Sequence, residues 1–358
     1  MYSADTGKVK ITVLTDDTVA SEALLAEHGV SILVELASGH RWLIDTGTTD
    51  IFMENARRMG ISLDNLTGIA ITHGHDDHTG GLTFYSRLKG NPPVYGHPYI
   101  WHKSYQIRPG MPVRITGMPY LARKEAAPFF HAVNHVAQLD DGLCFFTDIP
   151  REPGSFAPIA GNFFNEDGTG PVPLIDDAAI VIRVQEGLIV IIGCGHAGYT
   201  NILGAIHKEF PEGLDGIICN AGVGPVRPAE MIIALNFFAA VEMAEGVRDL
   251  LIKKGGCCVV TSSNSITNQT VRPDWVDMIS NVMEEDRVLD FAKDIPANQR
   301  ASAYSSSKHA LARWVRRISP SWAVDGLRIN SVAPGNTTTP MTQGMTEAQM
   351  DAALLIPI

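Results

Sequence analysis

The feature that most constrains this chain is a cluster of histidines and aspartates directly after an apolar run. Residues 69–71 (IAI) lead into residues 72–78 (THGHDDH). In an extended segment His73 and His75 face the same side, and neutral imidazoles and carboxylates are ligands that divalent ions prefer. Four such groups within six residues, at 73, 75, 77 and 78, favour a metal site over a solvated polar loop. Asp77 and His78 also offer donor groups for a second ion beside the first.

Length and charge limit the class of protein. The chain has 358 residues, enough for two or three domains with separate cores, and a net charge of −11 argues against nucleic acid as the main partner. Its five cysteines show no C-x-x-C spacing, so we expect no disulfide framework and no structural zinc module. We see no secretory signal pattern and no apolar segment near the roughly 20 residues of a membrane span. We therefore expect a cytoplasmic protein that acts on a small molecule, with no membrane partner.

Periodicity predicts a run of strands in the first half. Residues 8–14, 31–36, 41–44 and 66–72 have strand patterns, and 50–59 has the pattern of a helix that Gly60 ends. We also predict strands at 179–184 and 188–192 and a helix at 200–209. The Pro- and Gly-rich stretch 91–173 is expected to form loops and short strands over the metal cleft. Its histidines are His97, His102, His131 and His135, each of which we interpret as a hydrogen-bonded or solvated loop residue before a functional one.

At this point a resemblance is visible. Residues 43–47 (LIDTG) and the H-x-H-x-D-H motif resemble the metallo-β-lactamase fold. Residues 26–31 (AEHGVS) and 193–198 (GCGHAG) resemble the branch related to dihydropterin/ribofuranosylaminobenzene-phosphate synthase. The similarity extends over residues 8–210 and implies an α/β fold, an αββα sandwich, for a first domain at 1–210.

The resemblance also implies a site and a chemistry. The implied ligands are His73, His75 and His196 for one ion, and Asp77 and His78 for a second. Zinc is the expected metal, with other divalent ions as alternatives. The implied function is a metal-dependent hydrolase acting on a small-molecule ester or phosphoester, in which Asp77 also orients the nucleophile. Asp45 is expected to support the site through hydrogen bonds to a ligand.

Residues 193–198 leave alternatives open. Many members of the fold carry a bridging aspartate where this chain has Cys194; we assign this thiol no ligand role and expect it to pack in apolar surroundings. The family pattern includes a later histidine-bearing segment, but only His207 and His309 follow here, so one or two ions fit. The glycines of Gly193-x-Gly195-x-x-Gly198 also match a dinucleotide-binding turn. In a dinucleotide-binding fold, an acidic residue about 20 positions after the turn ends the next strand. Here Asp215 comes before its strand, so this is the minor interpretation.

Strand and helix patterns alternate after residue 211, which predicts a second domain at 211–358 with a parallel sheet. Its expected strands are 214–219, 257–261 and 327–332, and its helices 231–251 and 306–318. Tyr304 and Lys308 are one helical turn apart, where a cation beneath the phenol would stabilise phenolate and lower the tyrosine pKa. Such a tyrosine is a usable general acid or base.

With these residues in order, 214–345 resemble the short-chain dehydrogenase/reductase family, nearest to bacterial hydroxysteroid dehydrogenases. The motifs in this order are Asn220-Ala221-Gly222, Asn236, Ser263, Tyr304 with Lys308, and Pro334-Gly335. The resemblance implies Tyr304 as the acid/base and Lys308 as its partner and ribose ligand. It further implies Ser263 as a carbonyl hydrogen-bond donor, Asn236 in a water relay, and Asn220, Ala221 and Gly222 beside NAD(P).

The dehydrogenase pattern is partial. No T-G-x-x-x-G-x-G turn precedes Leu214 in the required register, and we expect a partial Rossmann-like sheet in which NAD(P) is the less favoured cofactor. The chain reaches Ile358 before the final strand of that fold. Three functions remain: the metal-dependent hydrolase, an NAD(P)-dependent oxidoreductase, and a catalytically inactive fusion product that retains a metal site. An open sheet edge predicts pairing with the first half or with a second copy as a homodimer.

Overall fold

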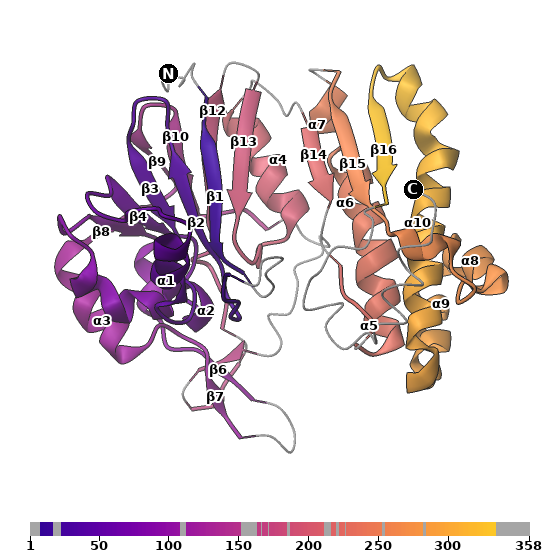
Figure 1. Cartoon of the computed structure of the whole chain (residues 1–358), viewed down its shortest axis with the longest axis horizontal. Helices are drawn as coiled ribbons and strands as arrows, with labels where there is room; N and C mark the ends of the chain where they lie inside the picture. The colour runs from indigo at the N-terminus through magenta and orange to yellow at the C-terminus, as the bar shows by residue number, and fades with distance from the viewer. Residues whose placement is uncertain are drawn as a thin grey trace. The chain divides into compact units, whose positions relative to one another are not determined.

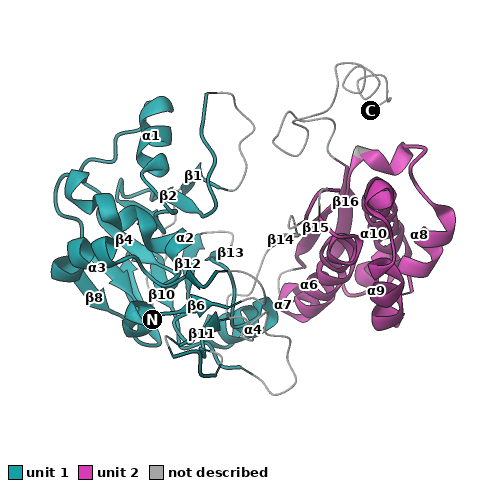
Figure 2. Ribbon diagram, turned by 90° about the horizontal axis from the view of Figure 1, so that it is seen from below, with its two compact units in different colours: residues 1–212 teal, residues 213–358 magenta. Residues whose placement is uncertain are grey.

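The computed structural model describes residues 8–16, 23–107, 112–151, 163–165, 167–170, 172–184, 187–210, 216–219, 222–225, 227–252, 255–281 and 284–333. The chain divides into two compact units, unit 1 at residues 1–212 and unit 2 at residues 213–358 (Figure 2). Several residues singled out above lie outside the described ranges: Asp215, Asn220, Ala221, Pro334 and Gly335.

The described residues of unit 1 form two main sheets and one small one (Figure 1). The first sheet has the order β1 (Lys10–Thr15), β2 (Ser31–Glu35), β3 (Arg41–Ile44), β4 (Gly68–Ile71), β5 (Val94–Gly96), β8 (Phe130–Ala132). The second has the order β13 (Gly187–Ile192), β12 (Ala179–Val184), β10 (Leu143–Phe146), β9 (Val136–Asp140). The small sheet has the order β11 (Phe163–Phe164), β6 (Tyr105–Gln106), β7 (Arg114–Ile115).

Alternation along the central strands gives this unit two cores. Successive side chains of a strand point to opposite faces, so in β4 Ile69 and Ile71 join one buried cluster while Ala70 joins another. The first cluster lies between the first sheet and its helices, where it includes Phe52. The second lies between the two sheets and includes Phe145. The helical segments of unit 1 are α1 (Ile51–Arg58), α2 (Asp76–Thr79), η1 (Gly80–Arg87), η2 (Pro98–Trp101), α3 (Tyr120–Ala126), η3 (Ala127–Phe129) and α4 (Tyr199–Glu209).

Helix α4 covers the outer face of the second sheet (Figure 1). Phe210, at the end of this helix, packs edge-on against Phe146 and lies under the guanidinium of Arg183. Helices therefore flank a two-sheet sandwich, which confirms the expected αββα architecture. The expectation for 91–173 was incomplete, because this stretch also contains helix α3 and two full strands, β9 and β10, of the second sheet.

Unit 2 has a parallel sheet of its own strands, in the order β14 (Gly216–Cys219), β15 (Cys257–Thr261), β16 (Arg328–Val332). The helical segments around it are α5 (Ala229–Ile233), the π-helical η5 (Ala234–Ala239), α6 (Ala240–Gly246), α7 (Arg248–Ile252), η6 (Asn264–Thr267), α8 (Pro273–Ile279), α9 (Glu285–Lys293), η8 (Ala297–Gln299) and α10 (Arg300–Val324). Parallel strands joined through helices confirm the Rossmann-like character of this half. Among the described residues, no helix has the length and apolarity to cross a membrane.

Candidate metal centre

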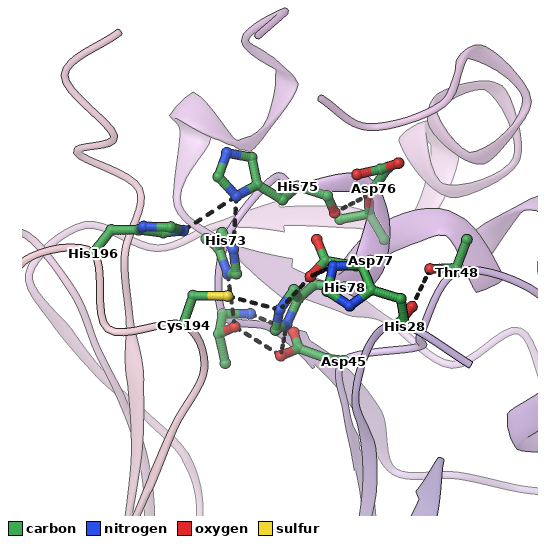
Figure 3. A network of polar contacts seen from close by, with 12 residues as sticks. His28, Asp45, Thr48, His73, His75, Asp76, Asp77, His78, Cys194 and His196 are labelled. Atoms are coloured by element: carbon green, nitrogen blue, oxygen red, sulfur yellow. Dashed lines mark hydrogen bonds and ion pairs between the residues drawn. The ribbon is translucent and has the colours of Figure 1, made fainter. Parts of the chain in front are cut away.

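The ends of two strands, one from each main sheet of unit 1, meet at the centre of the candidate site (Figure 3). Strand β4 leads into the loop that carries His73 and His75, and β13 leads into the loop that carries Cys194 and His196. The two loops touch at Gly193, where a Cβ atom would lie 2.3 Å from the Thr72 hydroxyl. Only glycine allows the backbone to approach this closely, so this residue is what lets the loops converge.

Three imidazoles face one another in the first group of donor atoms. His75 Nδ1 lies 3.2 Å from His73 Nε2 and 3.1 Å from His196 Nε2. Burial lowers the pKa of His73 and of His75, and it lowers the pKa of His196 to about 3. The rings are therefore neutral, and their nitrogen lone pairs converge with no acidic partner between them. This arrangement fits a divalent cation, which needs deprotonated ligands.

The second group consists of Asp77 and His78 beside His73, with ligand atoms that all lie within 4.8 Å of one another. His78 Nε2 lies 3.4 Å from Asp77 Oδ2, and His28 Nε2 lies 3.6 Å from the same oxygen on the exposed side. Burial opposes ionisation of Asp77, but the hydrogen bond and charge of His78 outweigh it and hold the carboxyl pKa well below its usual range. The carboxylate is thus available as a ligand or as an acceptor for water.

Asp45 orients ligands in both groups. Its Oδ2 accepts hydrogen bonds from His78 Nδ1 and from the Thr72 hydroxyl, each at 2.7 Å. Because the Thr72 hydroxyl donates to Asp45, it accepts from His73 Nδ1, which lies 3.2 Å away. Both imidazoles therefore keep their proton on Nδ1 and present Nε2 to the centre. The hydrogen bond to His78 confirms the supporting contact expected for this aspartate.

The same carboxylate sets the charge of His78. Burial would lower the pKa of His78, but the charge and hydrogen bond of Asp45 outweigh burial and raise it well above its usual value. Without a metal ion the site therefore holds a proton at this imidazole. A position that attracts positive charge in this way also fits a cation.

Two consecutive aspartates tie the ligand loops to the second sheet. Asp176 Oδ2 accepts a hydrogen bond from the backbone of Gly74 at 2.7 Å, between two of the histidines. Asp177 Oδ2 accepts one from the backbone of Ala197 at 2.8 Å, directly after His196. Burial raises the pKa of Asp177 to about 6. The loops that carry the donor groups are thus held by buried hydrogen bonds, as a preorganised site requires.

The small sheet forms a wall beside the donor atoms. The ring of Phe163 on β11 lies 4.6 Å from the ring of His75 and 5.9 Å from that of His196. An open pocket of about 650 Å³ adjoins this strand and is lined by Trp101, His102, Lys103, Asn165 and Asp167. Part of the stretch 91–173 therefore does lie over the site, as expected.

Comparisons with known proteins match the two halves of the chain to different families. Residues 25–199 match the profile of the metallo-β-lactamase superfamily, and residues 296–350 match that of the short-chain dehydrogenases. The N-terminal half of the chain is thus similar to the metallo-β-lactamase superfamily, and a shorter segment of the C-terminal half is similar to the short-chain dehydrogenases. These matches confirm both resemblances drawn from the motifs.

Individual relatives support the same division. The 7,8-dihydropterin-6-methyl-4-(beta-D-ribofuranosyl)-aminobenzene-5'-phosphate synthase of Methanocaldococcus jannaschii is 23% identical over 216 residues, 54% of this chain and 70% of that protein. The 3-alpha-hydroxysteroid dehydrogenase/carbonyl reductase of Comamonas testosteroni is 30% identical over 149 residues, 41% of this chain. This chain spans only 58% of that dehydrogenase. The crystal structure of a metal-dependent hydrolase of the β-lactamase superfamily superposes with a TM-score of 0.52 and 26% identity, covering 71% of this chain and 87% of the other.

One expectation for this half of the chain was wrong, and the minor interpretation of its glycines is also excluded. Cys194 does not pack among apolar groups: its sulfur lies 3.2 Å from His78 Nε2, inside the cluster. Its place directly after a strand, two residues before His196, was the signal that sequence reasoning undervalued. The dinucleotide-turn interpretation also fails, because β13 pairs antiparallel with β12 and so does not belong to a parallel βαβ unit.

The loop histidines have structural partners. His97 Nε2 lies 3.1 Å from a carboxylate oxygen of Asp148, and His102 Nε2 lies 3.0 Å from the side-chain oxygen of Asn165. His131 stacks on Tyr95. These contacts agree with the interpretation of these side chains as hydrogen-bonded or packed loop residues.

The dehydrogenase domain brings part of its expected set together. A Cβ atom on Gly222 would lie 2.8 Å from Asn236 Oδ1 and 3.2 Å from Lys308 Nζ. Lys308 Nζ donates a hydrogen bond to the carbonyl of Thr261, and burial lowers its pKa to about 8. The hydroxyl of Ser263 accepts a hydrogen bond from the Ser265 backbone, which caps η6. Tyr304 lies one turn before Lys308 on α10, as predicted.

Proposed function

We propose that the metallo-β-lactamase domain is a zinc-dependent hydrolase that cleaves an ester or phosphoester bond in a small molecule. The observation that carries this proposal is the convergence of three neutral imidazoles, His73, His75 and His196, next to the ionised Asp77. Nitrogen and carboxylate donors in this number suit zinc. Divalent ions in such a site activate a water molecule as nucleophile and stabilise the negative charge that develops on a phosphoryl or acyl oxygen.

The chain's own residues have separate roles in this chemistry. Asp77 would accept a hydrogen bond from the attacking water and so orient it towards the substrate. Asp45 holds His78 directly, and His73 through the Thr72 hydroxyl, in the tautomers that face the centre. Phe163 would exclude water from one side of the site and offer an apolar surface to the substrate.

Two relatives support the reaction class. One solved neighbour is described as a metal-dependent hydrolase of the β-lactamase superfamily. The relative from Methanocaldococcus jannaschii has a name that includes a 5'-phosphate, which favours a phosphate-bearing substrate here. Within the pocket beside β11, Lys103 is a cation that could contact such a group.

The test begins with the metal content of the purified protein, followed by hydrolysis of p-nitrophenyl acetate and bis(p-nitrophenyl) phosphate. Chelation should abolish turnover of at least one substrate and zinc should restore it, because the donor groups have no other means to activate water. His75→Ala should lose both metal and turnover. His40→Ala is the matched control, since it removes a histidine that pairs instead with Asp140 at 2.8 Å. Hydrolysis that persists without metal, or a protein that binds none, would contradict the proposal.

A second candidate is an NAD(P)-dependent oxidoreductase in unit 2, favoured by the juxtaposition of Gly222, Asn236 and Lys308. Titration with NADH and NADPH, followed by nicotinamide fluorescence, tests whether a cofactor binds. Turnover of a hydroxysteroid that is lost in Tyr304→Phe would support this candidate. Metal binding without either activity would instead support an inactive fusion product.

A further inference from the structure

Arg151, an exposed arginine of unit 1, is anchored by a strained backbone carbonyl. Its Nη2 donates a hydrogen bond of 2.6 Å to the carbonyl of Leu174. Leu174 is buried and left-handed, with φ at 45°, a conformation that a bulky side chain adopts only with strain. Strained backbone persists where the surrounding structure over-determines it, and such residues cluster at functional sites. This carbonyl therefore fixes where the guanidinium lies.

The segment that carries Leu174 also contacts the metal-facing loop. Two residues further on, Asp176 accepts a hydrogen bond from the Gly74 backbone, between two of the metal-facing histidines. Consecutive Cα atoms are about 3.8 Å apart, so at most about 7.6 Å separates the Cα atoms of Leu174 and Asp176. The charge of Arg151 is accordingly close enough to act on His196, which lies on the other ligand loop. Arg151 thus lies beside the candidate metal centre.

Arg151 is not the counter-ion of a neighbouring carboxylate. Within the described ranges no carboxylate lies at ion-pair distance from its guanidinium. Its charge acts on Asp177, yet the Oδ1 atom of that aspartate is buried without a hydrogen-bond partner. Since an arginine has five N–H donors and one printed contact uses Nη2, most of these donors are left for a ligand.

The surroundings of the metal centre also favour an anion. Between Asp77 and Glu125 the sequence has no aspartate or glutamate but seven lysines and arginines, although the whole chain has a net charge of −11. This run forms strands β6 and β7 and part of the pocket beside them. There the guanidinium of Arg123 lies over the ring of Trp101, 5.6 Å from its centroid. The Asp167 carboxylate in the same pocket already accepts two hydrogen bonds within its own turn. The local charge therefore differs in sign from that of the chain.

We propose that Arg151 is a specificity-determining residue that binds the anionic group of an organic phosphate, so that the hydrolase prefers such an anion to a neutral ester. This inference rests on the proposed hydrolase function and narrows its substrate class. A guanidinium presents parallel N–H groups that match two oxygens of a phosphate. Its fixed position means that little conformational freedom is lost when the anion binds.

The first test measures binding without turnover. Phenylphosphonate, an anion whose carbon–phosphorus bond such a hydrolase does not cleave, is titrated into the zinc-loaded full chain and followed by calorimetry. Arg151→Met should weaken binding about 10-fold or more, because a charge-assisted contact is lost. Arg151→Lys should recover part of that loss. Arg57→Met is the matched control, since this exposed arginine of α1 pairs with Glu54 at 2.8 Å and its loss should leave the affinity unchanged.

The second test compares two substrates that have the same leaving group and different charge. Bis(p-nitrophenyl) phosphate is an anion, whereas p-nitrophenyl acetate is neutral. Arg151→Met should lower kcat/KM about 10-fold or more for the phosphate and leave the value for the acetate unchanged. In the wild-type protein, kcat/KM for the phosphate should fall as the ionic strength rises.

The outcomes separate this inference from the proposed function. Equal losses for both substrates, or a phosphonate affinity that Arg151→Met does not change, overturn the inference and leave the hydrolase proposal standing. A wild-type protein that binds no phosphonate also overturns the inference. Phosphonate binding that depends on Arg151, in a protein without metal-dependent hydrolysis, supports the anion site and overturns the proposed function. Zinc content and urea unfolding of each variant check that a lost affinity is not a lost metal or a lost fold.

Discussion

Replacement of Asp45 by asparagine tests whether one buried carboxylate orients the metal-facing histidines. Asp45 accepts three hydrogen bonds of 2.7 Å, from the Thr72 backbone to Oδ1 and from the Thr72 hydroxyl and His78 Nδ1 to Oδ2. Its backbone is left-handed, with φ at 55°, a conformation that asparagine also tolerates. Asp45→Asn therefore changes the hydrogen-bonding chemistry without adding backbone strain.

The expected losses of zinc affinity and of folding stability follow from the hydrogen bonds that the substitution changes. The asparagine oxygen can keep the bond from the Thr72 backbone, which places its NH₂ group against His78 Nδ1. Two donors cannot bond there, so His78 must move its proton to Nε2, the atom that faces Asp77 and Cys194. Loss of such a supporting partner costs about 10–100-fold in metal affinity, or about 1.4–2.8 kcal/mol. Any buried donor left unpaired costs about 1–3 kcal/mol of folding stability.

The assay is competition for zinc between the protein and a chromogenic chelator at neutral pH, with urea unfolding of the metal-free protein in parallel. Asp140→Asn is the control, because Asp140 also accepts a hydrogen bond from a histidine, His40, outside the site. The control should keep wild-type zinc affinity. If Asp45→Asn also kept it, the argument that this carboxylate sets the tautomer of His78 would be refuted.

Three further predictions follow. In the metal-free protein, the pKa of His196 is about 3 in the folded state and 6.5 in the unfolded state, so its contribution to folding stability is complete above pH 6.5 and falls on acidification. Urea unfolding at pH 5 should show a loss of at most about 2 kcal/mol from this group. The loss should be smaller in His196→Gln. Phe163→Ala removes the ring beside His75 and should raise KM for aromatic esters, measured by initial rates, with zinc content unchanged. Lys308→Met should raise the thermal midpoint of unit 2 at pH 7. Burial lowers the pKa of Lys308 from 10.5 to about 8, so the charged ammonium costs about 3 kcal/mol of folding stability, more than its hydrogen bond to Thr261 contributes. The rise in the thermal midpoint should vanish above pH 10.5, where the lysine is neutral in both states.

The local hydrophobic pattern was sufficient to predict many of the strands and helices. The strands predicted at 41–44 and 257–261 coincide with β3 and β15, and the helix predicted at 50–59 contains α1. These segments have strong periodicity and clear end signals, which depend only on neighbouring residues. The metallo-β-lactamase and dehydrogenase resemblances likewise rest on short motifs and were confirmed by family profiles.

The stretch 91–173 shows where local pattern was insufficient. Strand β10 is a four-residue apolar run buried between β9 and β12, and such a run has no periodicity by which to recognise it. Helix α3 is short and begins after a proline, in a segment whose composition favours loops. Their structure depends on packing against partners that the segment itself does not reveal.

Some features of the candidate site could likewise be predicted from the sequence, and others only from the structure. The sequence by itself determined which donor types are present, that His73 to His78 form one local cluster, and that His196 lies in a loop after a strand. Only the tertiary structure decided that the ends of β4 and β13 converge, and that Asp45 contacts His78 directly and His73 through the Thr72 hydroxyl. It also decided that Cys194 faces His78 from 116 positions along the chain. Ligand geometry depends on distances of a few ångströms between segments far apart in sequence, and those distances are set by the packing of the two sheets and by the space left at Gly193.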